Sequence, residues 1–108
     1  MTNNELDQYE AAHILVKNYE LANNIYKSLQ KNQYLFTSLA KEYSICLSGK
    51  TGGYIGYFKK GDMVKEFENA IIHNKNNNKD TILEPVKSCF GWHVIFSYSK
   101  NKSLSRVS

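Results

Sequence analysis

The 108-residue sequence has no long hydrophobic run, and its first residues lack the features of an export signal. The densest apolar stretch near the start, residues 11–16, is far shorter than the roughly 20 residues that span a bilayer. Residues 1–10 contain Glu5, Asp7 and Glu10 but neither a basic segment nor an apolar core, unlike a signal peptide. We therefore expect no membrane partner and a cytoplasmic location.

Cysteine is scarce, since it occurs only as Cys46 and Cys89. This count permits one disulfide, but in a chain without an export signal we expect reduced thiols. Together with His13 and His93 the cysteines supply four soft donors, yet there is no Cys-x-x-Cys pair and no zinc-type histidine spacing. The sequence therefore predicts no metal and no cofactor.

Dense basic segments are absent as well. The formal net charge is +4, and the lysines are scattered, the longest basic run being Lys59 and Lys60. A nucleic-acid-binding surface normally has a denser patch, so that partner is not expected, although the positive charge keeps it as a testable alternative. A hydrophobic content of 42% in a chain of this length is typical of one folded domain, for which we expect a monomer.

Two segments show the alternation of β-strands. In residues 11–16 one face carries His13 and Leu15, and the other carries Ala12, Ile14 and Val16. In residues 92–99 one face carries His93, Ile95 and Ser97, and the other carries Trp92, Val94, Phe96 and Tyr98. Residues 81–86 form a third candidate strand, with Pro85 near its end, where proline is tolerated.

Three segments have the spacing of amphipathic helices. Their apolar positions are Leu21, Ile25 and Leu29; Phe36, Leu39, Ala40 and Tyr43; and Val64, Phe67 and Ile71. Asp62 is placed to cap the third helix. Before it, the glycine-rich residues 49–61 predict a loop, a brief extended segment and a turn.

The order of these elements predicts an α+β domain with a largely antiparallel sheet, because the strands do not alternate regularly with helices. The polar residues 73–80 predict a loop. We place the domain at residues 11–98, between flexible segments at 1–10 and 99–108.

Five blocks of the sequence, taken in order, resemble the parvulin-type peptidyl-prolyl cis/trans isomerases. They are AHILVK at 12–17, FTSLAKEYSIC at 36–46, GGYIGYF at 52–58, GDMVKEFE at 61–68 and PVKSCFGWHVI at 85–95. The resemblance implies a four-stranded antiparallel sheet surrounded by about four helices, in agreement with the α+β prediction. It also implies an enzyme that accelerates rotation about X-Pro bonds in proline-containing polypeptides and so assists protein folding.

Matching the family's motifs residue by residue implies two sets of site residues. The catalytic set is His13, Cys46, Ser88 and His93. The set that holds the proline ring in an apolar pocket is Ile55, Met63, Phe67 and Phe90. Without the resemblance, the pocket residues would be assigned to the core, the histidines would be hydrogen-bonded core side chains, and the cysteine would be a small buried hydrophobe.

Rotation about a peptide bond breaks no covalent bond, so we expect a non-covalent mechanism. An apolar pocket would remove the amide from water and weaken the hydrogen bonds that favour its planar form. A Cys46 thiolate near two histidines is an alternative nucleophile, but a rotation offers it no electrophile that must be attacked.

Some positions depart from the family's pattern. Leu47 stands where a proline often follows the cysteine, Tyr54 replaces a frequent aspartate and is expected to alter the mouth of the groove, and Ser88 stands where threonine is usual. Some relatives select phosphorylated Ser/Thr before proline through a basic cluster after the first strand. Residues 17–20 hold one lysine and one glutamate, so we expect no phosphate preference. The alternative function is a non-catalytic proline-peptide-binding or chaperone module.

Overall fold

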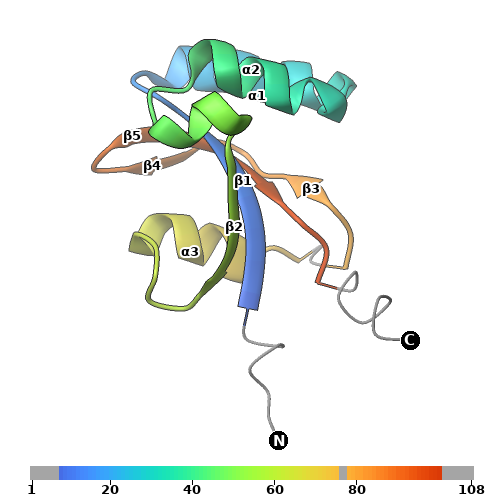
Figure 1. The fold of residues 1–108 in the computed structure, drawn as a ribbon, viewed down its shortest axis with the longest axis vertical. Coiled ribbons are helices and arrows are strands. Elements are labelled where there is room, and N and C mark those ends of the chain that lie inside the picture. The colour runs from blue at the N-terminus through green and yellow to red at the C-terminus, as the bar shows by residue number, and fades with distance from the viewer. Residues whose placement is uncertain (1–7, 76–77, 101–108) are drawn as a thin grey trace, which may run out of the picture.

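The computed structural model describes residues 8–75 and 78–100, which form an antiparallel sheet with helices on both of its faces (Figure 1). The elements in chain order are β1 (Gln8–Val16), α1 (Tyr19–Lys31), the 3-10 turn η1 (Gln33–Leu35), α2 (Phe36–Tyr43), the 3-10 turn η2 (Leu47–Thr51), β2 (Tyr54–Lys59), α3 (Lys65–Ile72), β3 (Thr81–Ile82), β4 (Val86–Ser88) and β5 (Gly91–Ser97). The expected α+β class with an antiparallel sheet is confirmed.

The sheet has the strand order β2-β1-β5-β3, and β4 pairs with the other end of β5. The sheet is therefore four strands wide, as expected, although the described residues contain five strands. The single strand expected at residues 81–86 is divided in two. The first part, β3, pairs with β5 up to Ile82, and the second part, β4, pairs with β5 from Val86 onward. Pro85, which has no N–H to donate, lies between the two parts.

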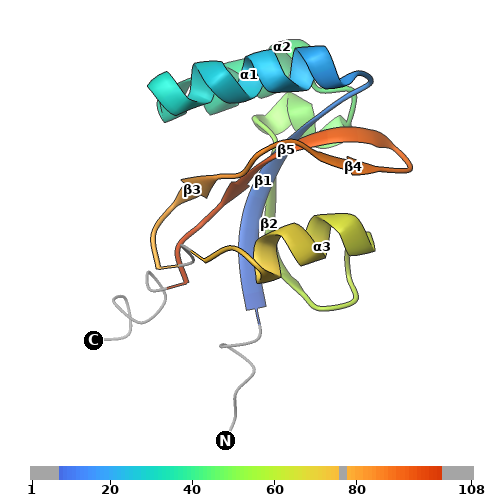
Figure 2. The ribbon, with the colours of Figure 1, turned by 180° about the vertical axis from the view of Figure 1, so that it is seen from behind.

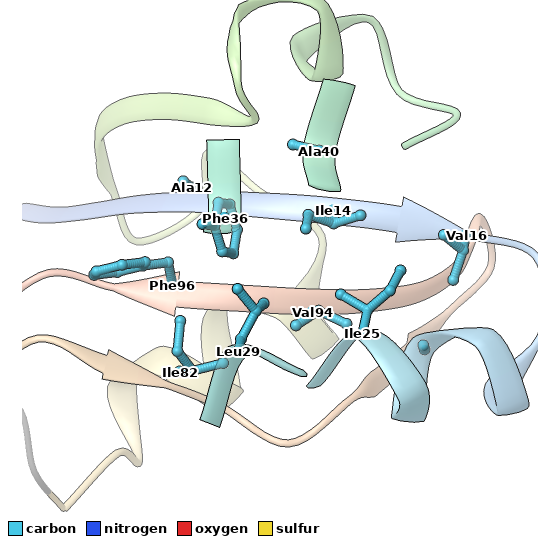
Figure 3. Close-up of a cluster of buried hydrophobic side chains, with 11 residues drawn as sticks. Ala12, Ile14, Val16, Ile25, Leu29, Phe36, Ala40, Ile82, Val94 and Phe96 are labelled. Atoms are coloured by element: carbon cyan, nitrogen blue, oxygen red, sulfur yellow. The ribbon is translucent and has the colours of Figure 1, made fainter. Parts of the chain in front are cut away.

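The alternation along β1 and β5 builds a separate core on each face of the sheet. Helices α1 and α2 cover one face and α3 covers the other, as Figures 1 and 2 show. The core under α1 and α2 contains Ala12, Ile14, Val16, Ala22, Ile25, Leu29, Phe36, Ala40, Ile82, Val94 and Phe96 (Figure 3). The core under α3 contains Ala11, Phe58, Phe67, Ile71 and Ile95. The predicted faces of both strands are thus confirmed, and the face with His13 and His93 lies on the α3 side.

Strand β1 begins at Gln8, earlier than the boundary expected at residue 11. Residues 8–10 are not a flexible segment, because they pair with residues 57–59 of β2. Of the expected C-terminal segment, Ser99 and Lys100 are described, and the N–H of Ser99 donates to Oδ1 of Asp80 at 2.7 Å. Residues 1–7 and 101–108 lie outside the described residues.

Asp62 does not cap α3, contrary to the sequence prediction. Val64 occupies the N-cap position of this helix, and its side chain makes no capping hydrogen bond. The Oδ2 atom of Asp62 instead accepts the backbone N–H of Lys59 at 2.8 Å and closes the turn after β2. Aspartate favours both roles, because its short carboxylate bonds nearby backbone N–H groups in turns as well as in caps.

Across the described ranges, no helix has the length and apolar character needed to cross a membrane.

Candidate active site

A cavity of about 440 Å³ opens on the α3 face of the sheet. This volume falls within the range of about 300–1,000 Å³ that is usual for ligand sites, and the wall is mainly apolar. The wall residues are His13, Leu15, Cys46, Ser48, Tyr54, Ile55, Met63, Val64, Phe67, Phe90 and His93. The structure therefore brings together all the site residues named from the sequence except Ser88, which lies behind His93.

His13 and His93 form a buried pair in the cavity wall. In the β1–β5 register Leu15 lies opposite His93, so the two histidines are diagonal neighbours on one face of the sheet. Their Nδ1 atoms are 3.0 Å apart and their rings are inclined by 19°. The side chains are 5% and 3% exposed, so this hydrogen bond is shielded from water.

Ser88 extends the pair from β4. Its hydroxyl oxygen is 2.7 Å from Nε2 of His93 and accepts the backbone N–H of Phe90 at 3.1 Å. A neutral imidazole has one donor and one acceptor nitrogen. Either Ser88 donates to His93, which then donates to His13, or both bonds run in the opposite direction. The proton positions of the three side chains are therefore coupled.

Burial favours the neutral form of both rings. Loss of hydration, with a smaller contribution from His93, lowers the pKa of His13 from 6.5 to about 4. Loss of hydration also lowers the pKa of His93, and the charge of Glu66 opposes this effect. The Nδ1–Nδ1 bond requires at least one neutral ring, since two imidazolium rings have no acceptor nitrogen.

Phe67 of α3 packs against both histidines. Its ring makes edge contacts with His13 at 5.5 Å and with His93 at 5.7 Å between ring centroids. A third edge contact, at 5.8 Å, joins it to Phe58 of β2. The side chain is fully buried, so Phe67 forms the floor of the cavity and supports the histidine pair at the same time.

Cys46 is held in the wall by two serines. The hydroxyl oxygen of Ser44 accepts the N–H groups of Leu15 at 3.1 Å and of Cys46 at 3.4 Å, which ties the cysteine loop to β1. The hydroxyl of Ser48 donates to the sulfur of Cys46 at 3.4 Å. Both cysteines are free thiols: Cys46 is half-buried, and Cys89 is exposed.

Within the described residues, no group of three or more His, Cys, Asp and Glu side chains is arranged to hold a metal.

Two glycines of the motif blocks allow the strands to approach the site closely. A Cβ on Gly53 would lie 2.5 Å from the carbonyl oxygen of His13, and a Cβ on Gly91 would lie 2.5 Å from that of Val16. Both residues also have positive φ angles, +86° and +140°, which L side chains rarely adopt. Glycine at these positions therefore lets β2 and β5 pack against β1 beside the histidine pair.

The mouth of the cavity has an aromatic edge. Phe90 is 57% exposed at the turn between β4 and β5, whereas Ile55 and Met63 are half-buried in the wall. The hydroxyl of Tyr54 donates to Glu10 at 2.7 Å, and this bond is the main reason that the pKa of Tyr54 rises to about 12. Its hydroxyl is thus engaged by Glu10.

Three wall residues were not assigned to the site from the sequence: Leu15, Ser48 and Val64. Tyr54, which was expected at the mouth of the groove, lines the cavity as well. Leu15 shares a strand face with His13, so the alternation in residues 11–16 already indicated that it lies on the same side of the sheet as the site. Val64 follows Met63, and Ser48 lies two residues after Cys46, but no spacing rule separates these from ordinary core and loop residues.

The chain matches known proteins along nearly its whole described length. The family model described as "Rotamase: PPIC-type PPIASE domain" matches residues 7–97. The foldase protein PrsA 1 of Bacillus cereus is 45% identical over 89 residues, which cover 82% of this chain and 30% of that protein. The chain thus spans about a third of the length of the curated relatives it matches.

Solved structures show the same fold. The peptidylprolyl isomerase PrsA from Bacillus anthracis has a TM-score of 0.78 and 32% identity, covering 99% of this chain and 52% of that one. NmPin, the parvulin of Nitrosopumilus maritimus, has a TM-score of 0.70 and 39% identity, covering 85% of this chain and 96% of that one. A family model over most of the sequence and a relative matched over almost its full length lead to one conclusion: the chain belongs to the parvulin family of PPIC-type peptidyl-prolyl isomerase domains.

Proposed function

We propose that this domain is a peptidyl-prolyl cis/trans isomerase that acts on proline-containing polypeptides without forming a covalent intermediate. The observation that carries the proposal is the hydrogen-bonded His13–His93 pair in the wall of a mainly apolar cavity. The apolar side chains suit a proline ring, and the polar pair in the same wall would face the amide that precedes the ring.

The apolar wall would act on the amide itself. Partial double-bond character gives the amide a rotation barrier of about 18–20 kcal/mol. Water stabilises the planar, charge-separated amide, so binding the prolyl group against Ile55, Met63 and Phe90 would favour the twisted form relative to the planar one. Each tenfold acceleration requires about 1.4 kcal/mol of extra transition-state stabilisation, so a modest difference in hydration is sufficient for catalysis.

The polar residues would complement this effect at the cavity edge. The neutral, coupled network of His13, His93 and Ser88 offers fixed dipoles to the rotating amide, with no net charge to be stabilised. Cys46 presents a half-buried thiol that already has a hydroxyl partner in Ser48. We assign Cys46 a polar, non-nucleophilic role, and mass spectrometry during turnover would contradict it by detecting a covalent adduct on this sulfur.

The direct test is an isomerisation assay on a short peptide with leucine before proline, at pH 8, comparing the wild-type chain with His93→Ala. The wild type is expected to accelerate cis/trans exchange. His93→Ala is expected to lower kcat/KM about 10- to 100-fold, because the change leaves two buried partners, His13 and Ser88, without their bonds.

The matched control is His73→Ala, which removes an exposed histidine at the end of α3 and is expected to leave kcat/KM unchanged. A wild-type chain that binds the peptide, for example by chemical-shift perturbation around Met63, but leaves the exchange rate unaltered would favour the alternative function of a non-catalytic proline-peptide-binding module.

We also propose that the isomerase does not select phosphorylated substrates. Of residues 17–20, Lys17 and Glu20 are exposed with opposite charges, and the amide oxygen of Asn18 is bonded to the N–H of Leu21 at the start of α1. No dense cationic surface supports a phosphate there. A phosphoserine-proline peptide is therefore expected to react no faster than its unphosphorylated counterpart, and a preference of tenfold or so for the phosphopeptide would contradict the proposal.

Assistance to protein folding is part of the proposal, and the word foldase in the names of the PrsA relatives supports it. The monomeric state, the cytoplasmic location and the absence of a nucleic-acid partner stay predictions from the sequence. Light scattering, cell fractionation and a salt-dependent DNA-binding assay would test them in turn.

A further inference from the structure

Glu68 is a buried carboxylate in α3 that lies outside the wall of the cavity. The side chain is 7% exposed, and its Oε2 atom accepts two backbone hydrogen bonds, from Gly61 at 2.6 Å and from Met63 at 3.0 Å. A buried carboxylate is costly unless such donors compensate for the lost hydration. Hydrogen bonds to an ionised acceptor are also stronger than neutral ones. The arrangement therefore holds the backbone at residues 61–63 against the helix.

These bonds take the place of a conventional helix cap. The residue at the N-cap of α3, Val64, has no side-chain oxygen, so the turn before the helix lacks that anchor. Glu68 supplies one from inside the first turn, where a negative charge is also favoured by the helix dipole. At the other end of the same turn, Asp62 accepts the N–H of Lys59 of β2. The turn is thus fixed at both ends by carboxylates.

The turn matters because it carries one wall of the cavity. Met63 and Val64 line the cavity, and the backbone N–H of Met63 is one of the two groups bonded to Glu68. Methionine has a long, flexible side chain, so the direction of Met63 depends on how firmly its backbone is held. A mobile turn would let this wall move away from a bound proline ring.

We propose that Glu68 is a positioning residue: its carboxylate fixes the turn at residues 61–63 and thereby aims Met63 into the substrate cavity. The expected effect of Glu68 on substrate binding rests on the proposed function. Its expected effect on the position of the Met63 side chain does not. Glu66 differs from Glu68 although both lie in the first turn of α3. The side chain of Glu66 is exposed, and among the described residues it makes no hydrogen bond to residues 61–63.

The kinetic test compares three variants at pH 8. Glu68→Ala is expected to raise KM about five- to tenfold with a smaller change in kcat, because it loosens a binding wall and leaves the histidine pair in place. Glu68→Gln is expected to stay within about threefold of the wild-type KM, because both N–H groups bond to one oxygen and an amide oxygen can accept both. Glu66→Ala, the matched control, is expected to keep the wild-type KM.

A second readout follows Met63 directly. The chain has two methionines, Met1 and Met63, so incorporation of methyl-¹³C methionine gives two methyl signals, which Met63→Leu assigns. The Met63 signal is expected to move and narrow in Glu68→Ala and to keep its place in Glu68→Gln and Glu66→Ala. If Glu68→Ala does not fold, Glu68→Asp replaces it, since the shorter carboxylate cannot reach both N–H groups and must also displace the Met63 signal.

An unchanged Met63 signal together with an unchanged KM in the folded Ala or Asp variant would overturn the proposal. A Met63 signal displaced as strongly by Glu66→Ala as by Glu68→Ala would overturn it too, because the loss of a negative charge from the first turn of α3, and not the loss of the two hydrogen bonds of Glu68, would then explain the effect. If the wild type shows no isomerase activity, the proposed function fails, and the methyl signals still decide whether Glu68 positions Met63.

Discussion

Replacing Phe67 by alanine is expected to destabilise the domain by about 3–5 kcal/mol and to remove most of the isomerase activity of the molecules that remain folded. The ring is fully buried and touches His13, His93 and Phe58. Its deletion would leave a void in the core under α3 and withdraw the support beneath the histidine pair. Since small domains are stable by about 5–15 kcal/mol, urea unfolding should detect the loss easily.

The two effects can be separated by a control on the opposite face of the sheet. Leu29 of α1 is 1% exposed in the other core, and Leu29→Ala is expected to cost about 2–5 kcal/mol as well. Its folded fraction should retain the wild-type kcat/KM, because α1 does not line the cavity. Phe67→Leu keeps most of the volume but loses the ring edges, and we expect about a tenfold lower kcat/KM. A wild-type kcat/KM in Phe67→Leu would contradict the role given to the ring.

Which residues lie on each face of the sheet could be predicted from the alternation of apolar and polar residues within each strand. Alternation has a period of two in any strand, so Ile14 and Val16 had to lie opposite His13 and Leu15 whatever the strand paired with. The three helices were predictable for the same reason, because their apolar stripes have the helical period. These parts of the fold depend on residues that are close together in the sequence.

The meeting of His13 with His93 was not predictable from pattern. It depends on the register in which Leu15 lies opposite His93, and nothing in either segment specifies that register. The resemblance to parvulins supplied the pairing, and the structure supplies the distance. The position of Glu68 shows the same limit, since a glutamate beside the apolar stripe of a helix is ordinarily solvent-exposed, whereas here a turn folds back over it.

Acid is expected to weaken the fold well before the carboxylates titrate. The pKa of His13 is about 4 in the folded chain and 6.5 without burial, so the folded state binds the proton less readily than the unfolded state. This difference favours folding by about 3 kcal/mol above pH 6.5, and the contribution disappears as the pH falls toward 4. The pKa of His93 is lowered in the same direction and adds to the loss.

Urea unfolding at pH 7.5 and pH 5 tests this expectation, because about 2 kcal/mol of the His13 contribution should already be lost at pH 5, above the usual range of carboxylates. In His73→Gln, imidazole NMR signals arise from His13 and His93 alone among the three histidines, so their titration can be followed directly. Activity should fall with stability, since protonation places a positive charge in the neutral network and, once both rings are charged, leaves the pair without an acceptor nitrogen. A folded chain in which both rings titrate near pH 6.5, with no loss of stability at pH 5, would show that the pair is open to water and would remove the basis for a neutral network in the site.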